Sequence, residues 1–442
     1  MTTALLALFA TCTVASSPCD GPAACRDSGV CVAGQCRIGS ERAVVEILST
    51  VAVPSPVMLA PGADLEARAA NLARRAEHAL DWTSFYAVIP REQHPRVPSI
   101  TPMTTPAQAM WRTFGVHRVM RLRVGRGLDP GSILVEVDVV DTARGEVIAI
   151  GAGPEQILAG GDRRAVARWI NALVGHDTGI PGCVGTRLLA SVEIRRGNKE
   201  IAVLEADGPG LSFVTSNGSL NLGPAWGPNG AVGYMSYLRR NPDWVVNGAP
   251  FSTRPGLNAA GAWSPDGRLL ALTVTEDGNS DIVLLDTASG GVRSRITTDP
   301  GVDTSAAWSP DGRKIAFVSD RTGGPQIWIH DVEAGSARRL SEVGYMGSPV
   351  WSPLGDTVVY TQLVAGQAIL LRHDLDTGRI QRLTEPGMSA EAPTISPDGR
   401  YVAFVRRSDG NPPSLWRIPI RGGDLRPLAQ HAWPLYAPDW QP

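Results

Sequence analysis

The sequence lacks the motifs that mark several common classes of enzyme. It contains no glycine-rich phosphate loop and no His-Glu-x-x-His pair, the signatures of many nucleotide and catalytic zinc sites. It contains no Gly-x-Ser-x-Gly elbow, and we expect no room for a hydrolase domain beside the repeats described below. The seven histidines are scattered at no ligand spacing. These observations predict a protein that is not an enzyme and that uses no metal or other cofactor.

The chain also lacks an excess of charge of either sign. Its 41 Lys and Arg residues nearly balance 43 Asp and Glu residues, which gives a formal net charge of -2. A chain with this balance has no general attraction to nucleic acid or to an anionic membrane. We therefore expect no nucleic acid as a partner, and membrane association only through other proteins.

The longest apolar run lies at the start of the chain. Residues 1–17, MTTALLALFATCTVASS, end in small residues and are too short to span a membrane as a helix. We interpret this run as a signal peptide and expect export to the periplasm. Cys12 follows a poor version of the lipoprotein box, so a lipoprotein leader stays open as an alternative to plain cleavage.

Cysteines are few, and most of them lie near the N-terminus. The gaps between the four cysteines of residues 18–39 differ from the Cys-x-x-Cys pairs of zinc sites. An even number of cysteines in an exported segment rich in glycine favours two disulfides, and three pairings are open. The four cysteines predicted to form disulfides are Cys19, Cys25, Cys31 and Cys36.

Glycine and proline, by contrast, are abundant, with 48 and 35 residues. They follow no triplet period, which points to many turns and a mostly β protein. The stretch GAWSPDGRLLALT begins at Gly261, and a close copy, AAWSPDGRKIAFV, begins at Ala306. Pro presets the first corner of a tight turn, Asp can bond its own backbone, and Gly accepts a positive φ, so Ser-Pro-Asp-Gly predicts a turn between two strands.

Full, degraded or truncated copies of this motif recur through the second half of the chain. Neighbouring copies lie about 45 residues apart for the most part, the length of a four-stranded propeller blade. The aromatic residue of the motif would then wedge between neighbouring blades, and the repeated aspartates would cap turns. The copies are centred on Trp226, Trp263, Trp308, Trp351, Ile395 and Trp440.

The two ends of the repeat region complement each other. The last copy supplies a first strand around Trp440, while the segment after Gly185 (TRLLASVEI, EIAVLEA, LSFVT) resembles later strands of a blade that has no first strand. Residues 185–442 therefore predict a six-bladed β-propeller, closed by pairing of the C-terminal strand with the first blade. Such closure leaves few exposed sheet edges.

Residues 40–180 show a different pattern and predict a small N-terminal α/β domain. Strand-like runs alternate with amphipathic segments, the first of which places Leu65, Leu72 and Leu80 on one stripe. Thr105 and Pro106 predict a second helix start. The expected strands cover residues 42–53, 118–124, 132–140 and 146–151, and the expected helices begin near residues 64, 105 and 162.

This order of elements resembles the TolB family of the bacterial Tol-Pal system. The likeness rests on the AWSPDGR repeats, on the junction GTRLLASVEI, on WRTFGVHRVMRLRV and SILVEVDVVDTARG in the N-terminal domain, and on the ending YAPDWQP. It implies a monomeric, non-enzymatic periplasmic scaffold that links the outer membrane and peptidoglycan to the inner-membrane Tol proteins, supporting outer-membrane integrity and cell division.

The resemblance also implies two protein partners. A Pal-like lipoprotein would dock on one mouth of the propeller, and TolA would bind an extended strand around residues 41–53 by β-augmentation. The positions that match the family's Pal-binding loops are Leu257, Asn258, Ala260, Thr304 and Ser305. Two other functions stay open: a propeller enzyme such as a metal-dependent lactonase or hydrolase, and an envelope propeller that binds an unrelated peptide or glycan.

Overall fold

The computed structural model describes the greater part of the chain. The described residues are 30–32, 35–37, 49–95, 105–151, 153–276, 278–341, 344–385, 387–408, 410–429 and 431–442. The predicted signal peptide lies outside these residues, as do Cys19 and Cys25. Strands β1 (Val30–Val32) and β2 (Gln35–Arg37) pair with Cys31 opposite Cys36, and the disulfides stay a prediction.

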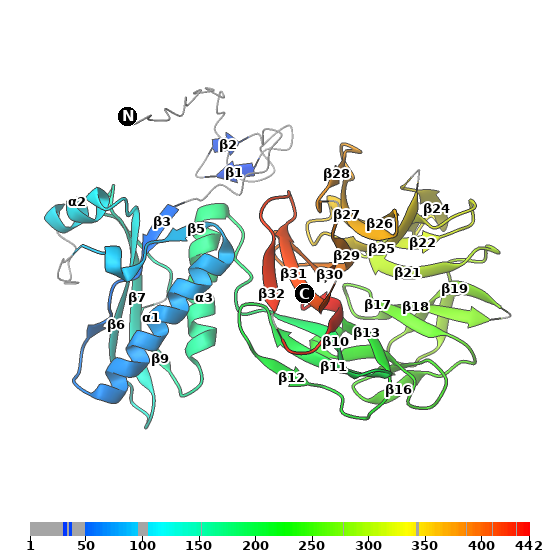
Figure 1. Cartoon of the computed structure of the whole chain (residues 1–442), viewed down its shortest axis with the longest axis horizontal. Coiled ribbons are helices and arrows are strands. Elements are labelled where there is room, and N and C mark those ends of the chain that lie inside the picture. The colour runs from blue at the N-terminus through cyan, green and yellow to red at the C-terminus, as the bar shows by residue number, and fades with distance from the viewer. Residues whose placement is uncertain are drawn as a thin grey trace.

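The first half of the chain forms a mixed sheet with helices α1 and α3 beside it (Figure 1). Strands run in the order β5-β3-β6-β7-β8, with β4 paired to β6 and β9 paired to β7. The apolar stripe predicted on the first helix is buried, since Leu65, Leu72 and Leu80 are at most 3% exposed. The bounds are β3 (Ser49–Ala52), β4 (Val57–Met58), α1 (Ala63–Thr83), β5 (Tyr86–Val88), a 3-10 turn (Arg91–Gln93), α2 (Thr105–Thr113), β6 (Arg118–Arg126), β7 (Ile133–Asp141), β8 (Val147–Ile148), β9 (Glu155–Ile157) and α3 (Asp162–Thr178).

The second half forms six four-stranded antiparallel sheets arranged around a ring (Figure 1), which confirms the predicted six-bladed propeller. We number the blades in chain order. Blade 1 contains β10 (Arg187–Arg195), β11 (Asn198–Glu205), β12 (Leu211–Phe213) and β33 (Leu435–Trp440); blade 2 contains β13 (Asn221–Trp226), β14 (Val232–Ser236), β15 (Asp243–Val246) and β16 (Ala249–Ser252); blade 3 contains β17 (Asn258–Trp263), β18 (Leu269–Glu276), β19 (Asn279–Asp286) and β20 (Val292–Arg295).

The other three blades follow the same plan. Blade 4 contains β21 (Asp303–Trp308), β22 (Lys314–Ser319), β23 (Gln326–Asp331) and β24 (Ser336–Arg339); blade 5 contains β25 (Tyr345–Trp351), β26 (Thr357–Val364), β27 (Gln367–Asp374) and β28 (Ile380–Arg382); blade 6 contains β29 (Ser389–Ile395), β30 (Tyr401–Ser408), β31 (Asn411–Pro419) and β32 (Arg426–Ala429). The predicted closure is confirmed, because β33 pairs with β10 and sets Trp440 opposite Leu188.

The opening motif has the local structure that its residues predict. In blade 3 the hydroxyl of Ser264 donates to Asp266 Oδ1 at 2.6 Å, and Asp266 Oδ1 also accepts from the backbone N–H of Arg268 at 3.1 Å. Gly267 adopts a φ of 71°, which a side chain would disfavour. The hydrogen bond from Ser264 lowers the pKa of Asp266, so the carboxylate caps the turn as predicted.

The aromatic residue of the motif lies between blades. Trp308 is 9% exposed, and its indole Nε1 donates to the carbonyl of Ala262, in the preceding blade, at 3.0 Å. Trp263 packs against Trp244 of blade 2 with ring centroids 6.2 Å apart. These contacts confirm the predicted role as a wedge between blades.

Each of the six innermost strands carries a bulge three residues before the motif's aromatic position. The pairing register shifts there, and the residue adopts a positive φ although five of the six are not glycine. A bulge bends its strand and re-aims the neighbouring side chains. The six residues are Gly223, Ala260, Ser305, Ser348, Ala392 and Ala437.

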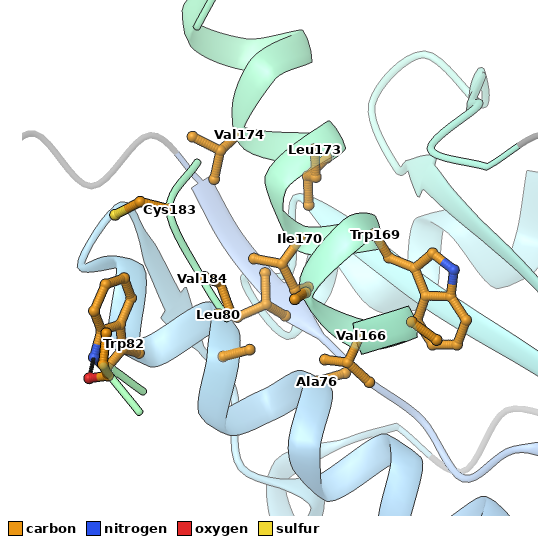
Figure 2. Close-up of a cluster of buried hydrophobic side chains, with 14 of the residues drawn as sticks. Ala76, Leu80, Trp82, Val166, Trp169, Ile170, Leu173, Val174, Cys183 and Val184 are labelled. Carbon is orange, nitrogen blue, oxygen red and sulfur yellow. Dashed lines mark hydrogen bonds between the residues drawn. The ribbon is translucent and has the colours of Figure 1, made fainter. Parts of the chain in front are cut away.

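The α/β part and the propeller share one continuous apolar core. Figure 2 shows the cluster in which Leu80 of α1 meets Ile170 and Leu173 of α3 beside Val184. This core continues into blades 1 and 6, and Trp82 donates from its indole to the carbonyl of Ala206 at 2.9 Å. Among the described residues, no helix has both the length and the apolar character needed to cross a membrane.

Candidate functional site

The two ends of the propeller differ in what they contact. At one end, the Ser-Pro-Asp-Gly turn of blade 6 faces the α/β part, where Arg400 donates to the carbonyls of Ile180 at 2.7 Å and Pro181 at 3.1 Å. The opposite end carries the hairpins that join the second and third strands of each blade and the loops that lead into the innermost strands. We call this opposite end the distal rim. The predicted partner-binding residues lie on it.

Of these residues, Asn258 points inward. It is 0% exposed, its Nδ2 donates to the carbonyls of Arg254 at 2.7 Å and Gly256 at 3.2 Å, and its Oδ1 accepts from Ser252 at 2.7 Å. A side chain buried and bonded in this way shapes the loop before β17. The side chain itself is not exposed on the distal rim.

The other four predicted residues lie closer to the surface. Leu257 directly precedes Asn258, and Ala260, two residues after it, is the bulge residue of β17, with a φ of 49°. Thr304 and Ser305 occupy the matching part of β21 in the next blade, where the hydroxyl of Thr304 lies 3.3 Å from that of Thr273. The structure thus brings residues of blades 3 and 4 together in one partly exposed stretch of the rim.

A cluster of charged side chains lies where blades 6 and 1 meet, and sequence reasoning missed it. Tyr436 donates to Glu193 Oε2 at 2.8 Å, Lys199 Nζ lies 3.3 Å from the centre of the Tyr436 ring, and Arg407 pairs with Glu391 at 2.7 Å. Its members come from five strands in three separate parts of the chain (β10–β11, β29–β30 and β33), so no local motif could have revealed it.

Burial shifts the pKa values of two residues in this cluster. Desolvation, followed by the hydrogen bond to Glu193, raises the pKa of Tyr436 to about 12. Desolvation also lowers the pKa of Lys199, and the nearby Glu193 opposes that shift. Because its cations and carboxylates are paired, the cluster provides a rigid polar surface on the distal rim.

The described residues offer little chemistry for catalysis. No three His, Cys, Asp or Glu side chains within the described ranges lie close enough together to hold a metal ion. Cys183 is buried, and desolvation raises the pKa of its thiol well above the ordinary value, which disfavours the reactive thiolate.

Comparison with known proteins agrees with this architecture. The family described as PD40, TolB beta propeller domain, matches residues 176–442. The Tol-Pal system protein TolB of Desulfosudis oleivorans is 35% identical over 142 residues, which is 30% of this chain and 32% of that protein. The Tol-Pal system protein TolB of Anaeromyxobacter dehalogenans is 33% identical over 194 residues, 42% of this chain and 43% of that protein.

These matches span less than half the length of the curated relatives. A solved structure, TolB from Acinetobacter baumannii, covers 89% of this chain and 96% of its own, with a TM-score of 0.75 at 23% identity. At this level of identity, the likeness shows that the two chains share a fold, including the α/β part. It does not assign residues on the distal rim.

Proposed function

Since the chain belongs to the TolB beta propeller domain family, we propose that it is a periplasmic, non-catalytic scaffold of a Tol-Pal system. The observation that carries this proposal is the family match over residues 176–442, the whole ring including its closing strand. Two curated relatives carry the name Tol-Pal system protein TolB, which supports the same role for this chain.

We place the docking site for a Pal-like lipoprotein on the distal rim, at blades 3 and 4. The opposite end is covered by the α/β part near blades 6 and 1, which leaves the distal rim open to a partner. Leu257, Ala260, Thr304 and Ser305 would contact the lipoprotein, and Asn258 would hold the loop that presents them. A partner bound there would leave the α/β part free for the inner-membrane proteins.

We place the TolA contact in the segment that precedes β3. Within the sheet, β3 pairs with β5 on one side and β6 on the other, so its backbone groups are already bonded. A strand added by TolA therefore needs residues 41–48, before Ser49. Deleting residues 41–48 should abolish TolA binding and leave lipoprotein binding intact.

Calorimetric titration with the soluble domain of the Pal-like lipoprotein from the same genome tests the docking site. We expect Leu257→Arg and Thr304→Arg to weaken binding at least about tenfold, because each places a long charged side chain within the contact surface. Ala288→Arg is the matched control, because Ala288 is exposed at the opposite end of blade 3. Unchanged affinity in both rim variants would refute docking at this site.

A further inference from the structure

A second feature of the distal rim is a cavity of about 360 Å³ in blade 6, formed by the end of β30, the start of β31 and the loop before β33. Cationic, amide, hydroxyl and aromatic side chains line it. None of the described residues that line it carries a carboxylate. The lining includes Arg406, Asn411, Pro412, Ser414, Trp416 and His431.

Two buried nitrogen atoms in this lining lack hydrogen-bond partners in the described part of the chain. They are Arg406 Nε and His431 Nε2. The guanidinium of Arg406 lies 4.3 Å from the centre of the Trp416 ring, within the range of a cation–π contact that holds it in place. Nε and the adjacent terminal nitrogen form the edge with which arginine binds a carboxylate through two parallel hydrogen bonds. A buried donor left unpaired calls for an explanation.

Blade 4 supplies the comparison that explains this unpaired atom. Trp328 lies opposite Phe317 there, as Trp416 lies opposite Phe404 in blade 6. An arginine, Arg321, also lies over Trp328, with its guanidinium 4.8 Å from the ring centre.

The arginine of blade 4 is fully engaged. Arg321 Nε donates to the hydroxyl of Ser319 at 2.7 Å, and Arg321 Nη2 donates to the carboxylate of Asp303 at 3.0 Å and 3.1 Å. Asp303 lies five residues before the motif's Trp308, and the residue at this position in blade 6 is Ala390. Ala390 is directly opposite Arg406 in the β29–β30 pair, as Asp303 is opposite Ser319 in blade 4. Blade 6 thus also places an arginine over its tryptophan, from the position of Ser319 rather than that of Arg321, but lacks the carboxylate.

We propose that the blade 6 cavity binds a carboxylate group supplied by an acidic side chain of the protein that docks on the distal rim. This inference rests on the proposed docking function. The adjacent Arg407 shows a contact of this kind, because its Nε donates to Glu391 Oε2 at 2.7 Å. An incoming carboxylate gives Arg406 the same partner, and the prolines of the hairpin keep the rim of the cavity rigid.

Titration of the full chain with glutarate, followed by NMR of the arginine Nε–Hε groups, tests the site directly. We expect glutarate, but not the neutral glutaramide, to shift one resonance that is absent from Arg406→Gln. In Ala390→Asp, the new carboxylate lies opposite Arg406 and should weaken glutarate binding at least about tenfold. Arg407→Gln removes a different arginine resonance, so glutarate should shift the Arg406 resonance in this variant as it does in the wild type.

Two results of this titration would overturn the proposal. The absence of any acid-dependent shift would mean that the cavity holds water only. An Ala390→Asp variant that binds glutarate like the wild type would mean that Arg406 is not the ligand. Circular dichroism checks that each variant is folded. If Ala390→Asp does not fold, the Arg406→Gln variant alone decides whether Arg406 is the ligand.

The source of the carboxylate is tested with the soluble lipoprotein domain. Ala390→Asp should weaken its binding about tenfold, whereas Ala288→Arg should not change it. If the lipoprotein binds Ala390→Asp as tightly as the wild type while glutarate binding is lost, the assignment to a partner side chain is wrong. If the lipoprotein binds no form of the protein, the docking function fails, and the glutarate titration still decides whether the cavity takes a carboxylate.

Discussion

The indole Nε1 of Trp440 donates a 2.8 Å hydrogen bond to the hydroxyl of Thr186, 254 residues earlier in the chain. Trp440 is 3% exposed and belongs to the core that the propeller shares with the α/β part. The bond joins β33, the last strand in the chain, to the residue just before β10, so one side chain links the two ends of the ring.

We expect Trp440→Ala to lower the free energy of unfolding by about 3–5 kcal/mol, since it removes a large buried aromatic side chain. Urea unfolding followed by circular dichroism measures this loss. Trp433 is the matched control: it lies in the loop before the same strand but is 39% exposed, with its edge against Phe213. Trp433→Ala should cost less than about 1 kcal/mol. Equal losses in the two variants would argue against a special role for the closing strand.

Arg417 holds the α/β part against blade 6. It is 2% exposed, and its guanidinium lies 4.2 Å from the centre of the Trp82 ring and 4.6 Å from that of Tyr401. It also donates to the carbonyl of Trp82. Desolvation lowers the pKa of Arg417, because burial disfavours the charged form of the guanidinium.

We expect Arg417→Met to keep most of the packing but to leave the Trp82 carbonyl without this donor, at a cost of about 1–3 kcal/mol. The α/β part should then unfold in a separate calorimetric transition at lower temperature. Arg426→Met is the control, because Arg426 pairs with Asp81 at the exposed edge of the same contact. A single transition at the wild-type temperature would mean that the desolvation of Arg417 cancels its contacts.

Asp439 makes the closure of the ring sensitive to pH. Its Oδ2 accepts from the backbone N–H of Trp226, in blade 2, at 2.6 Å. Desolvation raises its pKa to about 7, and the hydrogen bond from Trp226 opposes that shift. Since the pKa in the unfolded chain is about 3.9, folding takes up a proton between these values. The stabilising contribution is therefore complete below about pH 4 and is lost as the pH rises toward 7.

We expect Asp439→Asn to remove this dependence, because the amide keeps an acceptor for Trp226 and carries no charge. The variant should gain about 3 kcal/mol relative to the wild type between pH 5 and pH 8. Chemical denaturation at several pH values measures the difference between the two proteins, which cancels the titration of other groups. Parallel curves for variant and wild type would contradict the raised pKa.

The sequence predicted the propeller well because its repeats encode local structure. Ser264, Asp266 and Gly267 form the turn through bonds among neighbours, so the same letters predict the same turn wherever they recur. The closure was predictable for a related reason. The end of the chain supplies a first strand, and the segment after Gly185 supplies a blade that lacks its first strand, so the two segments complete one blade.

Contacts between distant residues could not be predicted in this way. Arg417 meets the Trp82 carbonyl across 335 residues, and nothing near either residue in the sequence marks the pair. The burial of Asn258 could not be predicted either, because the sequence places this residue in a loop next to exposed positions. The strand predicted over residues 42–53 is described only from Ser49 to Ala52, as β3.

A comparison of Asn258 with Asn221 separates loop shape from stability. Both residues occupy the first position of an innermost strand, both are 0% exposed, and each accepts a 2.7 Å hydrogen bond from a serine hydroxyl. Asn258 holds the loop at blade 3, whereas Asn221 binds Lys199 and Glu200 of blade 1.

Replacing either asparagine by alanine leaves buried groups unpaired, so we expect each variant to lose about 2–3 kcal/mol of stability in urea unfolding. Calorimetric titration with the lipoprotein should distinguish them, because Asn258→Ala should weaken docking about tenfold and Asn221→Ala should not. Equal effects on docking would mean that the lipoprotein responds to the stability of the ring as a whole, and the proposed site at blades 3 and 4 would have to be abandoned.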